Sequence, residues 1–258
     1  MVYLAERGYR ALVPDLRGYG DTTGAPVNDI SKFSLFHLVG DLIALLEAID
    51  PNEDNVFVVA HDWGALIAWH LCLFRPDKVK ALVNLSVHFF PRNPHMNLVE
   101  GFKALYGEDH YISRFQILFV LVCVYVNLSF VFNRYSTILM QHGTLNYPCT
   151  RDSGVKAILK KFLTYHDPAP FYFPKRKGLD AIPDAPAALS PWLSEEELDY
   201  YASKFEKTGF TGPVNYYRAL PLDWELTAPW TGAQVKVPTK FIVGSHQPKL
   251  GQDLVWNH

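Results

Sequence analysis

The strongest constraint on the fold is the stretch Val56–Phe74, in which a short apolar run leads directly into a helical pattern. Between the two lies Ala60-His61-Asp62-Trp63-Gly64, which fits the small-x-nucleophile-x-small pattern of a sharp strand-to-helix turn. Small residues are needed at both ends, because such a turn is strained and its strand and helix pass close together. A carboxylate at the tip implies attack on carbon and an ester intermediate, unlike the acyl-enzyme of a serine hydrolase.

Asp62 has two further interpretations. An Asp between a strand and a helix is commonly an N-cap, and a neighbouring His and Asp can contribute to a metal site. The flanking His61, Trp63 and Gly64 favour the nucleophile, because the motif and its strand–turn–helix context occur together. Adjacent residues on a tight turn do not converge on one ion, and the sequence shows no other ligand cluster. We therefore expect neither a metal nor a cofactor.

The order of apolar runs and helical patterns indicates an α/β fold. Short apolar runs separated by helical patterns are typical of a parallel sheet with crossover helices. We expect strands at 9–13, 56–59, 80–85 and 240–244, and helices at 1–8, 34–49 and 65–74. From about Pro91 to Pro229 the chain is rich in Pro, Tyr and Phe, and Ser194 with Glu197 forms a capping box. The sequence therefore predicts a core of residues 1–90 and 230–258, with a helical lid at 91–229.

Composition excludes several other classes of protein. With 49% hydrophobic residues the 258-residue chain can bury a core, and it is not a disordered composition. A formal net charge of -2 gives no electrostatic case for binding nucleic acid or an anionic membrane surface. The three cysteines, Cys72, Cys123 and Cys149, lack the number and spacing of a disulfide framework or a zinc site. No secretory signal opens the chain, so we expect a cytoplasmic protein.

One apolar segment is out of character with the rest. Residues 117–132 are uncharged and almost wholly apolar, and they belong to an atypical insert at about 117–151. A membrane span needs about 17–25 such residues, and this run falls slightly short and contains Asn127. A buried or misplaced hydrophobic insert is therefore favoured over a membrane helix, with membrane association through this run as the alternative.

Four stretches carry a resemblance to a known family. They are Asp15–Gly20, Val59–Ala65, Gly107–Tyr111 and Val214–Arg218. On these residues the chain resembles a plant-type soluble epoxide hydrolase of the α/β-hydrolase fold, from Met1 to about Gln116 and again from about Val155 to Gly244. The resemblance implies a mostly parallel sheet with a helical lid insertion.

The resemblance also implies a mechanism. Asp62 would attack a ring carbon of a small apolar epoxide, and Tyr111 and Tyr217 would donate protons to the ring oxygen, giving a vicinal diol after hydrolysis of the ester. Tyr216 is the rival of Tyr217 for the second donor. An epoxide oxygen is a poor leaving group until it is protonated, which explains the need for such donors.

The same resemblance assigns residues to the substrate pocket. It is also compatible with a second reaction. The backbone N–H of Trp63 would open the following helix and contribute to an oxyanion site, and the resemblance places His61 with Trp63 in that pocket. A Trp after an Asp nucleophile also suits halide binding, as in haloalkane dehalogenases. The two lid tyrosines favour the epoxide, because a halide leaving group needs no proton.

The chain departs from the family pattern near its ends. The family has further strands before the helix at Met1, and it places an orienting acid shortly after the strand that matches Phe241–Gly244. Gln247 stands near that position, and the catalytic His would come later than His258. The resemblance thus implies that the first strands and the last strand–helix units are missing. We expect an impaired hydrolase, with a catalytically dead ligand- or partner-binding member as the alternative.

Overall fold

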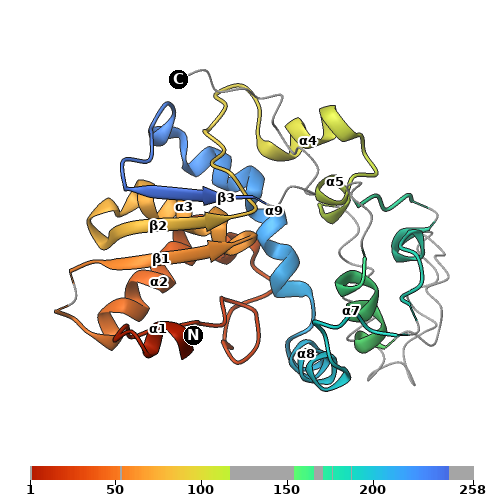
Figure 1. Ribbon diagram of the computed structural model, residues 1–258. Coiled ribbons are helices and arrows are strands. Elements are labelled where there is room, and N and C mark those ends of the chain that lie inside the picture. The colour runs from red at the N-terminus through yellow and green to blue at the C-terminus, as the bar shows by residue number, and fades with distance from the viewer. Residues whose placement is uncertain are drawn as a thin grey trace.

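The computed structural model describes residues 2–52, 54–116, 154–165, 171–175, 177–186 and 188–243. Within these ranges three strands form one parallel sheet in the order β1 (Val56–His61), β2 (Val79–Leu85) and β3 (Thr239–Ile242). His61 pairs with Leu85, and Leu85 pairs with Ile242, so the carboxyl ends of the strands meet at one edge (Figure 1). The apolar run 117–132 and the tail from Gly244 lie outside the described residues.

Two helices build the core against one face of this sheet. The helix α3 (Trp63–Phe74) packs on β1 and β2, and α2 (Leu35–Ile49) packs on α3. A helix that is apolar on all sides must be buried, and α3 buries seven of its residues, from Ala65 to Cys72. Val58 and Ala60 of β1 point into this core. The predicted helices at 34–49 and 65–74 are confirmed to within two residues of each end.

The opposite face of the sheet is exposed, and one predicted strand is wrong there. Residues 9–13 form no regular structure, and Tyr9 and Val13 are 53% and 74% exposed. The ring of Tyr9 contacts that of Phe57 edge-on, with centroids 6.3 Å apart. A strand is defined by its backbone ladder, however, and β1 pairs with β2 alone among the described strands. The short apolar run Ala11–Val13 therefore did not suffice to form a strand.

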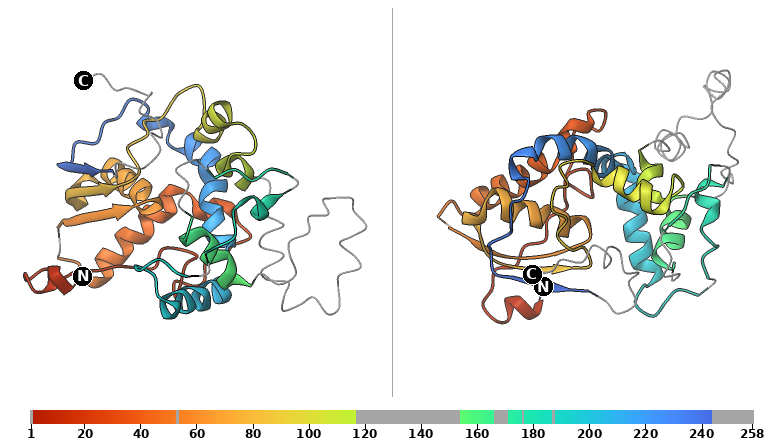
Figure 2. Two further views of the ribbon diagram at one scale, coloured as in Figure 1. Left: turned by 45° about the vertical axis from the view of Figure 1, so that its right-hand side comes forward. Right: turned by 90° about the horizontal axis from the view of Figure 1, so that it is seen from above.

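The helices between β2 and β3 form a second layer. They are α4 (Leu98–Tyr106), α5 (Tyr111–Phe115), α7 (Val155–Leu163), α8 (Glu195–Thr208) and α9 (Thr211–Leu226). Seen from above in Figure 2, α7 and α8 lie beyond α9 from the strands. The predicted capping box at Ser194 and Glu197 is confirmed at the start of α8. The division of the chain into core and lid at 91–229 stays a prediction.

The remaining elements are short. They are α1 (Val2–Ala5) and the 3-10 turns η1 (Ile30–Phe33), η2 (Pro76–Lys78), η4 (Gly178–Ala181) and η5 (Ala228–Trp230). Across the part of the chain that the structure describes, no helix combines the length and apolar character that crossing a bilayer requires.

The helix α9 joins the two layers (Figure 1). Its first turn passes so close to the loop before α2 that a Cβ on Gly212 would lie 2.8 Å from the Cα of Gly18. Side chains along α9 then bond to the core backbone. Asn215 Nδ2 donates to Val27 O, Tyr216 Oη donates to Arg17 O, and Asp223 Oδ1 accepts the Leu35 N–H. These contacts hold α9 on the core, although it lies within the predicted lid.

Candidate active site

Asp62 occupies a strained turn at the carboxyl edge of the sheet. Its φ of 52° and ψ of -124° are rare for a residue other than glycine, and such strain is common at functional sites. The side chain is exposed, and Oδ2 accepts the backbone N–H of Trp63 at 2.7 Å. A Cβ on Gly64 would lie 4.0 Å from Ala60 Cβ, an ordinary contact. The turn therefore tolerates small side chains at Gly64.

Two lid tyrosines lie over this turn. Tyr111 begins α5 and Tyr217 lies in α9, and their ring centroids are 5.8 Å apart at an interplanar angle of 80°. The Trp63 ring packs edge-on against Tyr217 at 4.9 Å. The sequence segments that carry Asp62, Tyr111 and Tyr217 are distant in the chain, and the fold brings all three residues to one cavity.

The surroundings keep both phenols protonated. Burial is the main cause that raises the pKa of Tyr111, and the negative charge of Asp62 adds to it. Burial likewise raises the pKa of Tyr217 well above its ordinary value, with contributions from Tyr111 and Asp62. A hydrogen bond with the Trp63 side chain lowers that pKa in part. Two half-buried, protonated phenols therefore line the same cavity as the exposed Asp62 carboxylate.

Tyr216 is placed differently from its neighbour. It is fully buried, and its hydroxyl donates to Arg17 O at 2.8 Å. Its ring packs against Trp63 with centroids 5.3 Å apart, on the core side of α9. The hydroxyl of Tyr216 is engaged with the core backbone, and this geometry favours Tyr217 as the second donor.

A short backbone clasp positions Tyr111. Its N–H donates to Phe171 O at 2.9 Å, and Phe173 N–H donates to Asp109 O at 2.7 Å. Between these bonds, His110 and Tyr172 form an isolated antiparallel bridge. The start of α5 is therefore fixed by a segment about 60 residues further along the chain.

The cavity at Asp62 has a volume of about 110 Å³. Its walls are mostly apolar and come from α3, the loop after β2, α4, α5 and α9. They are formed by Trp63, Leu66, Val87, Phe90, Leu98, Phe102, Tyr111, Ile112, Tyr217 and Leu220, together with Asp62, Ser86 and His88. His61 has an exposed side chain at the end of β1 and is not among the lining residues.

Sequence reasoning missed Ser86 and His88 as lining residues. They directly follow β2, and side chains that follow neighbouring parallel strands gather at the same edge of a sheet. Ser86 also has a positive φ of 74°. Burial lowers the pKa of His88, so its imidazole is neutral near pH 7. The sequence did contain a signal for these two residues, because they follow the predicted strand 80–85 and so lie at the carboxyl edge of the sheet.

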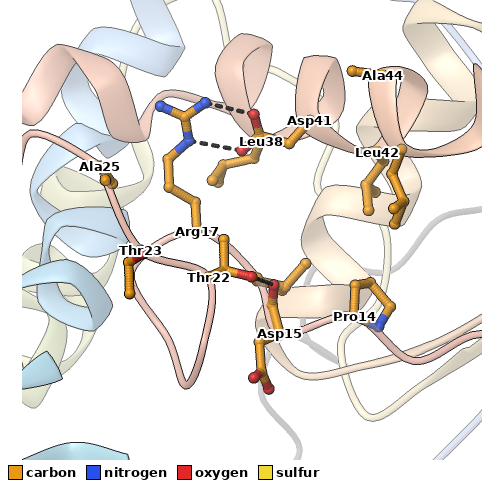
Figure 3. Close-up of a pocket in the computed structure, with 13 residues that line it drawn as sticks. Pro14, Asp15, Arg17, Thr22, Thr23, Ala25, Leu38, Asp41, Leu42 and Ala44 are labelled. Atoms are coloured by element: carbon orange, nitrogen blue, oxygen red, sulfur yellow. Dashed lines mark hydrogen bonds and ion pairs between the residues drawn. The ribbon is translucent and has the colours of Figure 1, made fainter. Parts of the chain in front are cut away.

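A larger cavity of about 430 Å³ lies elsewhere, between α2 and the loop of residues 14–25. Arg17 makes a bidentate ion pair with Asp41 there, with Nε to Oδ2 at 2.7 Å (Figure 3). Asp15 points away from that pair and accepts the Asp21 N–H, which closes the turn at Gly20. Asp62 and the two lid tyrosines do not line this cavity. We therefore place the chemistry at the smaller one.

A carboxylate on a strained strand–helix turn, with helices inserted above the sheet edge, defines an α/β-hydrolase. Residues 1–107 match the family model described as alpha/beta hydrolase fold. Epoxide hydrolase 2 of Siraitia grosvenorii is 48% identical over 95% of this chain and 68% of its own length. Epoxide hydrolase A of Mycobacterium tuberculosis is 32% identical over 96% of this chain and 70% of its own length.

Solved structures show the same similarity. Potato (Solanum tuberosum) epoxide hydrolase I has a TM-score of 0.79 and 72% identity, over 95% of this chain and 69% of that one. The chain belongs to the epoxide hydrolases of the α/β-hydrolase fold. The resemblance drawn from the sequence, and the fold class with it, are confirmed.

Proposed function

We propose that this chain opens small apolar epoxides through an ester on Asp62. One Asp62 carboxylate oxygen attacks a ring carbon, and the bond between that carbon and the ring oxygen breaks. The ring oxygen takes a proton from Tyr217 or Tyr111, which leaves a hydroxyalkyl ester on Asp62 and one tyrosinate. The observation that carries this proposal is the convergence of an exposed carboxylate and two half-buried, protonated phenols on one cavity.

The donors favour an epoxide over a halide as the group displaced. An alkoxide leaves poorly, so a proton delivered to it in the transition state accelerates the opening by about 10²–10⁴-fold. A halide leaves as a stable anion and needs no proton from a phenol. Two phenol hydroxyl groups in the same cavity as Asp62 therefore suit a strained ether.

The cavity walls support an apolar substrate. Leu66, Phe90, Leu98 and Phe102 offer aliphatic and aromatic surface, and few of the lining residues are polar. The named relatives are epoxide hydrolases, which agrees with a strained cyclic ether in this position. Small aromatic or aliphatic epoxides are the substrate class.

The second half of the reaction is proposed to be slow. Hydrolysis of the ester needs a base that is oriented by an acid. Among the described residues no histidine forms a hydrogen bond with a carboxylate, and His88, which lines the cavity, packs its ring against Phe90 at 4.0 Å. Loss of one member of a catalytic unit commonly costs several orders of magnitude in turnover. The ester on Asp62 then accumulates.

Mass spectrometry of the intact protein after incubation with styrene oxide tests the proposal. We expect one covalent adduct, mapped to the peptide that contains Asp62, and less than one diol per protein molecule in the first minutes. Asp62→Asn is the control, because it keeps an acceptor for the Trp63 N–H but removes the carboxylate. No adduct on the folded protein would mean a ligand-binding member of the family. Diol formed over many turnovers would overturn the proposed impairment, and halide release from a haloalkane would indicate a dehalogenase.

We also propose a cytosolic location. Cys72 is a buried free thiol, in agreement with a reducing compartment, whereas Cys123 and Cys149 lie outside the described residues. Fractionation of cells that express the tagged chain tests this. Recovery with membranes, lost when the run 117–132 is made polar, would contradict the proposal.

A further inference from the structure

A proline interrupts the hydrogen bonds of α9 beside the proposed proton donor. Pro221 lies inside this helix. Proline has no N–H, and the carbonyl four residues before it loses its usual intrahelical donor. That carbonyl belongs to Tyr217. The residue proposed to protonate the ring oxygen thus carries a main-chain acceptor that the helix itself cannot satisfy.

A side chain from α5 supplies the absent donor. Gln116 Nε2 donates to Tyr217 O at 2.7 Å, and the same nitrogen lies 3.4 Å from Ile112 O. Gln116 is the C-cap residue of α5, the five-residue helix that begins at Tyr111. One amide therefore connects the helix that carries the first proposed donor to the backbone of the second donor.

We propose that Gln116 is a positioning residue that sets the relative placement of Tyr111 and Tyr217 over Asp62. This role rests on the proposed function, because it concerns the donors of that reaction. A helix of five residues is too short to be stable alone, so α5 depends on outside contacts for its orientation. The clasp at Phe171 holds its beginning, and Gln116 holds its end.

The packing around the amide supports this role. The Phe115 ring lies edge-on to Tyr217 at 5.0 Å and to Tyr111 at 5.8 Å, so the end of α5 contacts both donors. Apolar ring contacts alone permit sliding, whereas a hydrogen bond to a fixed carbonyl defines one position. Loss of the amide leaves Tyr217 O without this donor and frees α5 to shift against α9.

Three variants separate the effect of the Gln116 hydrogen bond from the effect of the size and shape of its side chain. Gln116→Met keeps the length and removes the hydrogen bond. Gln116→Glu keeps the shape but, when ionised, turns an acceptor toward an acceptor. Gln234→Met makes the same chemical change at an exposed glutamine and is the matched control. For each, the rate of Asp62 ester formation with styrene oxide is measured against epoxide concentration and pH, after circular dichroism has shown a native fold.

Gln116→Met is expected to lower the maximal labelling rate about tenfold, with a smaller change in the half-saturating concentration, since small displacements of catalytic groups act mainly on the chemical step. Gln116→Glu is expected to form the ester more slowly still at neutral pH. The ratio of its rate to that of Gln116→Met should rise as the pH falls, because a protonated carboxyl group donates a hydrogen bond again. Gln234→Met keeps the wild-type rate. Equal rates in wild type and Gln116→Met, or a pH-independent ratio of the two Gln116 variants, would overturn the proposal.

Hydrogen–deuterium exchange tests the positioning role of Gln116 independently of the proposed function. If the wild-type protein forms no ester, the proposed function fails. Exchange at residues 110–116 still reports whether the hydrogen bond from Gln116 to Tyr217 O holds α5 in place. Faster exchange there in Gln116→Met supports it, and unchanged exchange overturns it. Pro221→Ala restores the N–H for Tyr217 O. In the double variant with Gln116→Met we expect α9 to regain protection and α5 to stay fast, because the link between the helices is still absent.

Discussion

At the scale of single residues, Tyr216 and Tyr217 offer a comparison within one turn of α9. Consecutive helical residues point about 100° apart, so one neighbour faces the core and the other faces the Asp62 cavity. Tyr216 bonds to Arg17 O, whereas Tyr217 lines the cavity. The same substitution at the two positions should therefore affect different properties.

Tyr217→Phe is predicted to lower the rate of Asp62 ester formation by about 100-fold, since it removes one of the two proton donors. Its melting temperature should change little. Tyr216→Phe, the matched control, is predicted to lower the free energy of unfolding by about 1 kcal/mol, because the Arg17 carbonyl loses its buried partner. Its labelling rate should stay near wild type. Stopped samples analysed by mass spectrometry and thermal unfolding measure the two effects, and the reverse pattern would exchange the two roles.

The sequence predicted the Asp62 turn because the signal is local. A strand, a small-residue turn and a helix follow each other within 19 residues, and the observed turn has the strained backbone that this order implies. The choice between Tyr216 and Tyr217 could not be made in the same way. It depends on the rotation of α9 about its axis, which is set by contacts with Gly18 and Arg17, about 200 residues earlier in the chain.

At the scale of elements, α2 shows how a distant residue can replace a local cap. Ser34 occupies the N-cap position of α2, but its side chain makes no capping bond. Ser34 Oγ pairs with His37 Nδ1 instead. The Leu35 N–H is bonded by Asp223 of α9 at 2.7 Å. A carboxyl group at the start of a helix also suits the helix dipole. Sequence patterns could not reveal this partner, 188 residues away.

Asp223 is predicted to make stability depend on pH. Burial raises its pKa from 3.8 to about 7, with the Leu35 N–H opposing in part. Between about pH 4 and pH 7 the folded protein holds a proton that the unfolded chain has released, so stability falls as the pH rises through this window and levels off above it. The slope should be at most about 1.4 kcal/mol per pH unit, the limit for a single proton. Urea unfolding at several pH values measures it.

Substitutions at Asp223 distinguish the effect of its charge from its role as the acceptor of the Leu35 N–H. Asp223→Asn keeps an acceptor for the Leu35 N–H and should flatten the pH dependence between pH 4 and pH 7. Asp223→Ala removes the acceptor as well and should cost about 1 kcal/mol of stability, as expected for a lost helix cap. An unchanged slope in Asp223→Asn would assign the pH dependence to other groups.

At the scale of the whole molecule, the sheet and the lid helices meet through α9. Ion pairs add to the contact between the layers, since Lys204 and Lys207 of α8 both contact Asp21. Asp21 lies in the loop of residues 14–25, here called the core loop. Exposed ion pairs contribute little individually, and salt weakens them. The steric contact of Gly18 with Gly212 is the more demanding part, because two backbones touch there. The sequence patterns placed α2, α3 and the start of α8 but gave no sign of this crossing.

Gly212→Ala is predicted to disturb both stability and the site. The new Cβ would lie 2.8 Å from Gly18 Cα and O, so the first turn of α9 must move away from the core loop. We expect a loss of about 1–3 kcal/mol, the usual range for overpacking, and slower ester formation, because Tyr217 lies on the displaced helix. Gly101→Ala in α4 is the control. Its Cβ would lie 3.7 Å from Met96 Cε, so the gain in helix propensity should leave the protein as stable as wild type or slightly more so. Equal stability of the two variants would mean that the core loop yields to the added methyl group, and the contact would then not determine where α9 lies.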